Sequence, residues 1–239
     1  MAGHQLLGLG KRDEFLHGLC TPGVRGDGLS VMLWPQPEPT VEDTMTPAGA
    51  APTQICGLSL DDFLVRMEEF HGHASPGVTM GGFMVDAAWR QLGDAPYLNA
   101  AVETVVCLPD AVQMLTPCTL GNGFLQVLDW GKFALTLYDR KSLQGARAWL
   151  DVSRLEDYPL VANWYLRRPE NQAVEKDEVV RAILAGGHGL VRVRPVRMRA
   201  GLKDQDKVPT TACPACGEYH PQRQGTLCPA CAGQAYYDL

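Results

Sequence analysis

The stretch SLDDFLVRMEEFHGHASPG, residues 59–77, decides how the folded part of the chain begins. Ser59 precedes Asp62 by three residues, which is the spacing of a capping box that satisfies free N–H groups at a helix start. Apolar side chains then recur on one helical face: Leu60, Phe63, Leu64 and Met67. The pattern predicts an amphipathic helix that is capped by Ser59 and runs to about Phe70.

The segment after this helix carries two histidines. Residues 71–77, HGHASPG, contain glycines and a proline that permit tight turns, and residues 78–92 are predicted to form a second helix. The imidazoles of His71 and His73 can point at one common position, where free N–H groups of the second helix would favour an anion or a thiolate. Alternatively, the two histidines only satisfy hydrogen bonds within their own loop.

The remaining chain alternates between strand and helix patterns. A β-branched run predicts a strand over 101–107, followed by a short helix over 110–115. Later elements are expected as a hairpin of 124–129 with 132–138, a strand over 146–152, helices over 154–167 and 174–185, and a strand over 188–199. The prediction is an α+β fold, with packed helices on a mixed or antiparallel sheet.

Composition divides the 239 residues into three parts. The first, residues 1–57, is rich in proline and glycine and predicts a poorly ordered extension, before an α+β core over 58–200 and a tail over 201–239. Within the extension, residues 17–23 partly echo the histidine loop. That echo is either the remnant of a repeat with a second ligand cluster or a chance match.

Charge and hydropathy narrow the classes of partner. The net charge is −6 and the pI is about 5.5, which opposes the clustered basic surface that nucleic acid requires. Lys11-Arg12-Asp13-Glu14 interrupts the start of the chain where a secretory signal would be apolar, and no apolar run approaches the ~20 residues that span a bilayer. We therefore expect a cytoplasmic protein without a membrane partner.

The tail contains two C-x-x-C pairs. These are Cys213 with Cys216 and Cys228 with Cys231, and eleven residues separate the pairs. Structural zinc takes four ligands tetrahedrally, and each pair presents two thiolates from one turn, so the pattern predicts one structural zinc ion. The alternative is four unrelated thiols or two redox dithiols. Because four sulfurs complete the ligand set, His220 is expected to be a surface residue of the hairpin between the pairs.

An arginine-rich strand precedes the tail. In residues 191–194, VRVR, the alternation places Arg192 and Arg194 on one face, which could meet an acidic partner or an anionic cofactor. The ordinary alternative is an edge strand that its charges and Pro195 protect from pairing with another chain.

Several segments in the same order resemble the FmdE family, named after the FmdE component of formylmethanofuran dehydrogenase. They are Phe70-His71-Gly72-His73-x-x-Pro76-Gly77, Glu103 with Cys107, Asp110-Ala111-x-Gln113-x-Leu115-Thr116-x-Cys118-Thr119-x-Gly121, Asp129-x-Gly131-Lys132, and a tail that begins Cys-x-x-Cys-Gly-Glu at position 213. The resemblance covers about residues 59–235. It implies a dimeric α+β body with a metal-binding cleft at the His-Gly-His loop and a zinc-binding tail.

One position departs from the family pattern. The family loop usually reads His-Gly-His-x-Cys-Pro-Gly, whereas this chain has Ser75 in place of the cysteine. A hydroxyl is a much poorer zinc ligand than a thiolate and, without a base beside it, a poorer nucleophile. The substitution therefore puts a reaction that depends on this cysteine in doubt.

The resemblance also points to a second transition metal in the core. Its ligands would be His71 and His73, with Cys107 and Cys118 as candidate thiolates and Asp110 as a ligand or a partner of one. Lys132 would meet an anionic group of a ligand. Each has a plainer alternative, since Cys107 can be a buried strand residue, Asp110 a helix cap and Lys132 a solvated lysine.

Three functions follow. The first, implied by the resemblance, is an accessory protein that handles metal or cofactor for a molybdenum- or tungsten-dependent oxidoreductase of the formate or formylmethanofuran type. The second is an enzyme whose metal at His71 and His73 acts on a small carbonyl substrate, for which the sequence offers no clear general base. The third and weakest is a nucleic-acid-binding protein that uses the zinc-ribbon-like tail and the arginine strand, which the acidic net charge opposes.

Overall fold

The computed structural model describes residues 52–167, 174–199, 202 and 208–237, together with the backbone of two short strands near the N-terminus. Those strands, β1 (Thr21–Val24) and β2 (Ser30–Leu33), pair antiparallel, although the sequence shows no strand period there. The echo at 17–23 lies outside the described residues, apart from the backbone of its last three. The chain divides into two units, residues 1–201 and 202–239.

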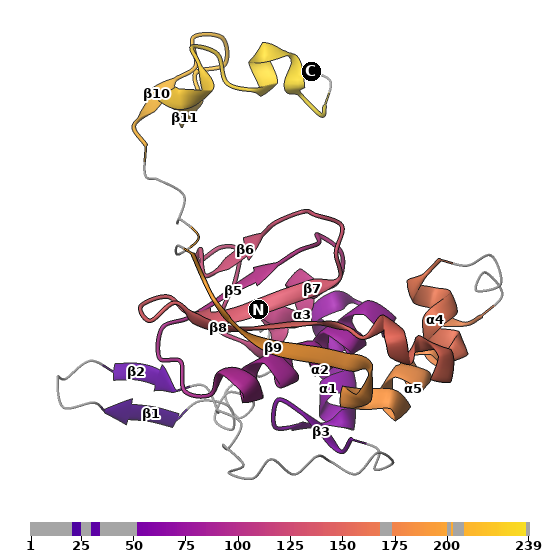
Figure 1. The fold of residues 1–239 in the computed structure, drawn as a ribbon. Helices are drawn as coiled ribbons and strands as arrows, with labels where there is room; N and C mark the ends of the chain where they lie inside the picture. The colour runs from indigo at the N-terminus through magenta and orange to yellow at the C-terminus, as the bar shows by residue number, and fades with distance from the viewer. Residues whose placement is uncertain are drawn as a thin grey trace, which may run out of the picture. The chain divides into compact units, whose positions relative to one another are not determined.

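The first unit is built on a five-stranded sheet with the order β6-β5-β7-β8-β9 (Figure 1). Its strands are β5 (Leu98–Val102), β6 (Leu125–Val127), β7 (Ala134–Asp139), β8 (Gln144–Leu150) and β9 (Val191–Arg197). The pair of β5 and β6 is parallel and the other pairs are antiparallel, so the sheet is mixed.

Two expectations about this sheet are wrong. Residues 124–129 and 132–138 do not form a hairpin, because β5 lies between β6 and β7 and bonds to both. The strand expected over 101–107 ends at Val102, and Cys107 has φ +60°, which no strand residue adopts. By contrast, β9 is an edge strand with Arg192, Arg194 and Pro195 exposed, as the plainer interpretation of the arginine pattern has it.

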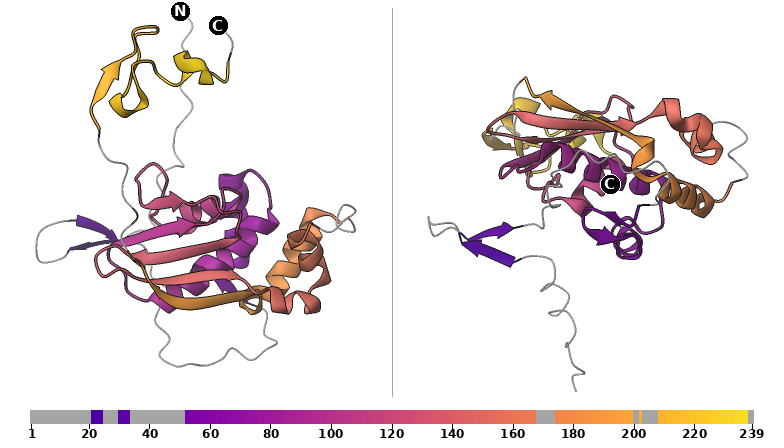
Figure 2. Two further views of the ribbon diagram at one scale, coloured as in Figure 1. Left: turned by 45° about the horizontal axis from the view of Figure 1, so that its top comes forward. Right: turned by 60° about the horizontal axis from the view of Figure 1, so that its bottom comes forward.

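The longer helices cover one face and one end of this sheet (Figure 2). They are α1 (Leu60–His71), α2 (Pro76–Leu92), α3 (Leu108–Leu115), α4 (Pro159–Tyr165) and α5 (Lys176–Gly186). The short turns η1 (Val152–Asp157) and η3 (Gly187–Leu190) precede α4 and β9. The cap at Ser59 is confirmed, since Ser59 Oγ accepts a hydrogen bond from the Asp62 N–H at 3.1 Å, while the Asp62 carboxylate accepts from the Ser59 hydroxyl at 2.6 Å.

Helix α2 is the centre of the core. It packs on β7, β8 and β9 with its other sides against α3 and α5, and Met80, Phe83 and Met84 are fully buried. Two glycines let neighbouring helices approach it closely. A Cβ at Gly82 would lie 2.7 Å from the Phe63 ring of α1, and one at Gly81 would lie 2.6 Å from Ala111 Cβ of α3.

The body begins before Ser59. The hairpin of β3 (Gln54–Ile55) and β4 (Leu58–Ser59) buries Ile55 completely. It is tied to α2 because the Cys56 N–H donates to Asp86 at 2.9 Å. Burial alone would raise the pKa of Asp86, but the hydrogen bond from His188 at 2.5 Å and the charge of Arg90 hold it below its ordinary value. One buried carboxylate therefore joins three segments.

The second unit is small. Strands β10 (Thr210–Ala212) and β11 (Tyr219–Pro221) form a hairpin, followed by the turns η4 (Gln222–Gln224) and η5 (Ala230–Gln234). The expectation that His220 lies on the surface is wrong, because only 5% of this residue is exposed. No helix among the described residues is long and apolar enough to cross a membrane.

Candidate functional site

The C-terminal unit brings its four cysteines to one point. The ligand atoms of Cys213, Cys216, Cys228 and Cys231 all lie within 4.8 Å of one another. Cys213 and Cys216 lie in the turn between β10 and β11, whereas Cys228 and Cys231 lie where η5 begins. Four sulfurs from two turns at this spacing match the donor set that structural zinc prefers.

Backbone N–H groups donate to two of the four sulfur atoms. The Cys228 N–H donates to Cys213 Sγ at 3.4 Å, and this bond contributes most to lowering the pKa of Cys213 to about 6. The Cys231 N–H likewise donates to Cys228 Sγ at 3.5 Å. Zinc binds the thiolate, so donors that favour a thiolate favour the metal.

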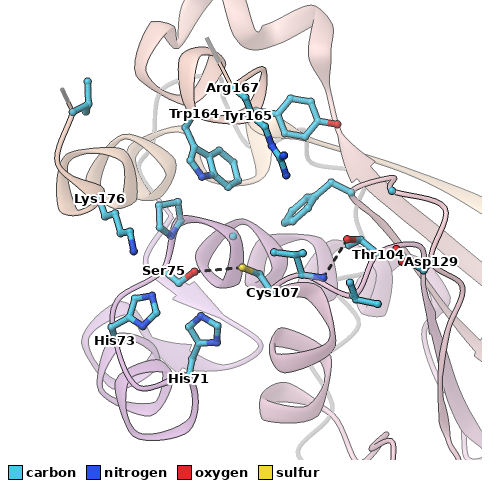
Figure 3. A pocket seen from close by; sticks show the side chains of 17 residues that line it. His71, His73, Ser75, Thr104, Cys107, Asp129, Trp164, Tyr165, Arg167 and Lys176 are labelled. Atoms are coloured by element: carbon cyan, nitrogen blue, oxygen red, sulfur yellow. Dashed lines mark hydrogen bonds between the residues drawn. The ribbon is translucent and has the colours of Figure 1, made fainter. Parts of the chain in front are cut away.

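The first unit contains a cleft of about 940 Å³ at the histidine loop (Figure 3). One side is made by His71, His73 and Ser75, between α1 and α2. The floor comes from residues 104–107, which connect β5 to α3, and the opposite side from the end of α4 and the start of α5. The cleft therefore joins segments that are about 100 residues apart in the sequence.

His71 is held by a carboxylate from another helix. Its Nδ1 lies 2.6 Å from Asp110 Oδ2 of α3, and the two side chains are 17% and 36% exposed. If Nδ1 carries the proton and donates it to Asp110, the Nε2 lone pair stays free to bind a metal. The His73 ring lies 4.8 Å from that of His71, centroid to centroid. Asp110 is thus placed as a partner of His71.

Ser75 and Cys107 meet at the centre of the cleft. Their Oγ and Sγ atoms are 3.7 Å apart, and Ser75 Oγ also caps α2 by accepting from the Val78 N–H at 3.4 Å. Burial raises the pKa of the Cys107 thiol, with Asp110 acting in the same direction and Ser75 and Lys176 opposing it. A Cβ at Gly77 would lie 2.6 Å from Cys107 Sγ, so any residue larger than glycine at this position would clash with the thiol.

A buried ion pair holds the floor of the cleft. Arg147 of β8 donates two hydrogen bonds to Glu103, at 2.7 and 2.8 Å, and Glu103 is only 6% exposed. The Glu103 carbonyl oxygen also accepts from the N–H groups of Trp130 and Lys132. Glu103 therefore fixes the loop that leads to Cys107 and does not line the cleft.

Two of the candidate residues lie elsewhere. Cys118 is completely buried, its Sγ is 3.5 Å from the Leu98 carbonyl oxygen, and burial raises its pKa to about 12. Lys132 is exposed beside the Trp130 ring, 5.7 Å from the ring centroid, and does not line the cleft. Within the described residues, the four zinc cysteines are the one group of three or more His, Cys, Asp or Glu side chains close enough to hold a metal ion.

Other residues that line the cleft are not predicted from the sequence. An aromatic wall is formed by Phe133, Trp164 and Tyr165, and two cationic side chains, Arg167 and Lys176, flank it. The stretch WYLRR at 164–168 is a usable signal, because an aromatic pair followed by arginines at a helix end is uncommon on a purely solvated face.

The chain matches known proteins along most of its length. Residues 70–196 match the family model described as "FmdE, Molybdenum formylmethanofuran dehydrogenase operon", and residues 204–238 match the FmdE treble clef zinc finger. The crystal structure of a protein from Syntrophus aciditrophicus, described as like the FmdE component of tungsten formylmethanofuran dehydrogenase, is 36% identical with a TM-score of 0.69. The match covers 79% of this chain and 100% of that one.

A curated relative matches over a shorter stretch. A probable S-adenosyl-L-methionine-binding protein of Archaeoglobus fulgidus is 41% identical over 107 residues, which cover 41% of this chain and 29% of that protein. The chain thus spans less than a third of that relative's length. The family model covers more than half of the chain, and the treble clef model covers the four cysteines that form its zinc site. The chain belongs to the FmdE family and ends in that family's treble clef zinc finger.

Proposed function

We propose that the protein is an accessory protein that handles metal for a molybdenum- or tungsten-dependent oxidoreductase of the formate or formylmethanofuran type. The observation that carries the proposal is the contact of 2.6 Å between His71 and Asp110 in an open cleft. Metal-binding histidines characteristically donate their second ring nitrogen to a carboxylate, which fixes the tautomer and the ring orientation. The descriptions of the family and of the Syntrophus protein support the link to such enzymes.

The cleft residues do not form the close group that the four cysteines of the finger form, and a looser arrangement suits a metal that has to leave again. His71 and His73 offer two nitrogens on one side, and Cys107 offers a thiol whose pKa burial raises. A structural ion takes four protein ligands, as in the zinc finger, whereas a site with fewer leaves positions open for exchange. We therefore propose that a transition metal in the cleft is cargo, while the zinc in the finger is resident.

A catalyst acting on a small carbonyl compound is the alternative use of the same residues. It requires a metal with an open position and a group that moves a proton beside it. Asp110 is held by its contact with His71 Nδ1. This geometry favours a positioned ligand over a proton shuttle, so the accessory role is the better supported of the two.

Metal quantitation tests the cargo site. Zinc-loaded protein is briefly equilibrated with Co²⁺ without oxygen, and both metals are measured before and after treatment with EDTA. About one zinc ion per chain should resist EDTA, whereas the cobalt ion that is bound before the treatment should be lost. His71→Ala and Asp110→Ala should weaken cobalt binding about 10–100-fold and leave the zinc in place.

Asp129→Asn is the matched control, because Asp129 lines the cleft but takes no part in the pair of His71 and Asp110. Zinc alone in the wild type, unchanged by His71→Ala, would remove the basis of the proposal.

The accessory role itself is tested by co-purification with the oxidoreductase and by that enzyme's molybdenum or tungsten content after deletion of the gene. We also propose that the protein is a homodimer and lies in the cytoplasm. Size-exclusion chromatography with light scattering tests the homodimer.

A further inference from the structure

The cleft is larger than a bound metal requires. Its volume is about 940 Å³, near the upper end of the ~300–1,000 Å³ that is usual for pockets of small organic ligands. A hydrated metal ion or a bare oxyanion would fill a small part of it. The side opposite the histidines therefore has room for an organic ligand.

That side presents flat apolar surface. Phe133, Trp164 and Tyr165 pack with ring centroids 6.0 to 6.4 Å apart in edge-on or tilted contacts, and all three are only partly buried. Figure 3 shows the Trp164 indole reaching into the cleft, toward Ser75 and Cys107. Aromatic side chains that stay partly exposed inside a cavity are suited to stack on a planar ring.

The same side carries positive charge that is not neutralised. Arg167 follows α4 and Lys176 begins α5, both are exposed, and neither forms an ion pair with a described residue. Both point into the cleft in Figure 3. The first residues of α2, Pro76 and Gly77, also line it, so the positive end of that 17-residue helix adds to the potential.

We propose that the cleft binds a small molecule that combines a planar heteroaromatic ring with a phosphate. The ring would stack on Trp164, and the phosphate would lie between Lys176, Arg167 and the start of α2. This inference rests on the proposed function, because the organic ligand would reach the cargo metal from the side opposite His71 and His73. The ring accounts for the aromatic wall and the phosphate for the two cations.

Calorimetric titration of the full chain with matched pairs tests the proposal. The probes are AMP, GMP and flavin mononucleotide, their counterparts adenosine, guanosine and riboflavin, and inorganic phosphate and molybdate as anions without a ring. At least one ring phosphate should bind about tenfold or more tightly than both its counterpart and the bare anions. If no ring phosphate exceeds its counterpart and the bare anions, the proposal is wrong.

Variants separate the two halves of the ligand. Trp164→Ala should weaken the best ring phosphate about tenfold and leave molybdate binding unchanged, whereas Lys176→Met should weaken the ring phosphate and not its uncharged counterpart. The matched controls are Phe70→Ala, an exposed aromatic residue outside the cleft, and Arg181→Met, an exposed cation on α5. Equal effects of the controls and the cleft variants would overturn the assignment.

Titration in the presence and absence of Co²⁺ distinguishes this inference from the proposed function. Cobalt binding that depends on His71 without binding of any ring phosphate would refute the inference and leave the cargo site in place. Binding of a ring phosphate that depends on Trp164, without cobalt binding, would refute the cargo site and leave the ligand assignment in place.

Discussion

The zinc finger and the cleft collect their functional side chains in opposite ways. The finger takes four identical ligands from 19 consecutive positions, 213–231, and two local turns suffice to bring them together. The cleft takes histidines from the end of α1, a serine from the start of α2, a thiol from the start of α3 and cations beside α4 and α5. The finger can form wherever its own segment folds, whereas the cleft exists only when the whole body is packed.

The two sites also differ in how far the folding free energy of their surroundings depends on a bound ligand. Zinc binding supplies much of the folding free energy of so small a unit, so site and fold are lost together. The cleft is supported by a core that exists without any ligand, with α2 buried along most of its length. Changes in the cleft should therefore alter binding while the body stays folded.

Cys213→Ser is the change with the largest expected effect. Structural zinc contributes about 10–16 kcal/mol to small zinc-binding units, and the loss of one thiolate should leave residues 208–237 unfolded. Zinc quantitation and limited proteolysis should show loss of the metal and cleavage within the finger. Cys107→Ser removes a thiol from the body and should retain zinc. Protection of the finger in metal-free Cys213→Ser would show that it folds without zinc.

Gly77→Ala tests whether packing in the cleft can be disturbed without an effect on the zinc finger. The added Cβ would lie 2.6 Å from Cys107 Sγ, so the thiol or helix α2 has to shift, and overpacking of this kind costs about 1–3 kcal/mol. Urea unfolding measures the loss, and zinc content should not change. Gly121→Ala is the control, because nothing lies within 4 Å of a Cβ there. Equal stabilities for the two variants would mean that Cys107 adapts freely.

The sequence predicts the parts of the molecule that depend on neighbouring residues. Short-range spacing sets the helix cap at Ser59, the helix after the histidine loop and the four zinc ligands. The hairpin expected around Trp130 fails because β5, some 25 residues earlier in the chain, takes the place between β6 and β7. Strand order depends on the whole sheet, and adjacency in sequence is only a tendency.

The same reason explains which site residues could be predicted. His71, His73 and Ser75 stand in one loop, and the loop itself indicates a site. Trp164 and Lys176 reach the cleft only because α4 and α5 pack at the end of the sheet, and a local pattern such as WYLRR at 164–168 does not say which loop they will face. The burial of His220 could not be predicted for a related reason, since a complete set of four sulfurs does not reveal which other side chain fills the small core of the finger.

Ser75→Cys has the smallest expected effect on stability and tests whether the cleft can be made more like the finger. The thiol is a poor substitute for the hydroxyl that caps α2, so we expect a loss of about 1 kcal/mol in the free energy of unfolding. In return, a second sulfur would stand about where Ser75 Oγ now lies, 3.7 Å from Cys107 Sγ and on the side of the two histidines. Two thiolates beside two imidazoles form a donor set that soft metals prefer, so Co²⁺ should bind at least about tenfold more tightly and show thiolate absorption.

Ser75→Ala loses the same cap without gaining a ligand, and the two variants should therefore unfold at similar urea concentrations but differ in cobalt affinity. Equal cobalt affinities would show that the histidines and Cys107 do not converge on one metal, and the contrast between a resident and a transferable site would then have to rest on the finger alone.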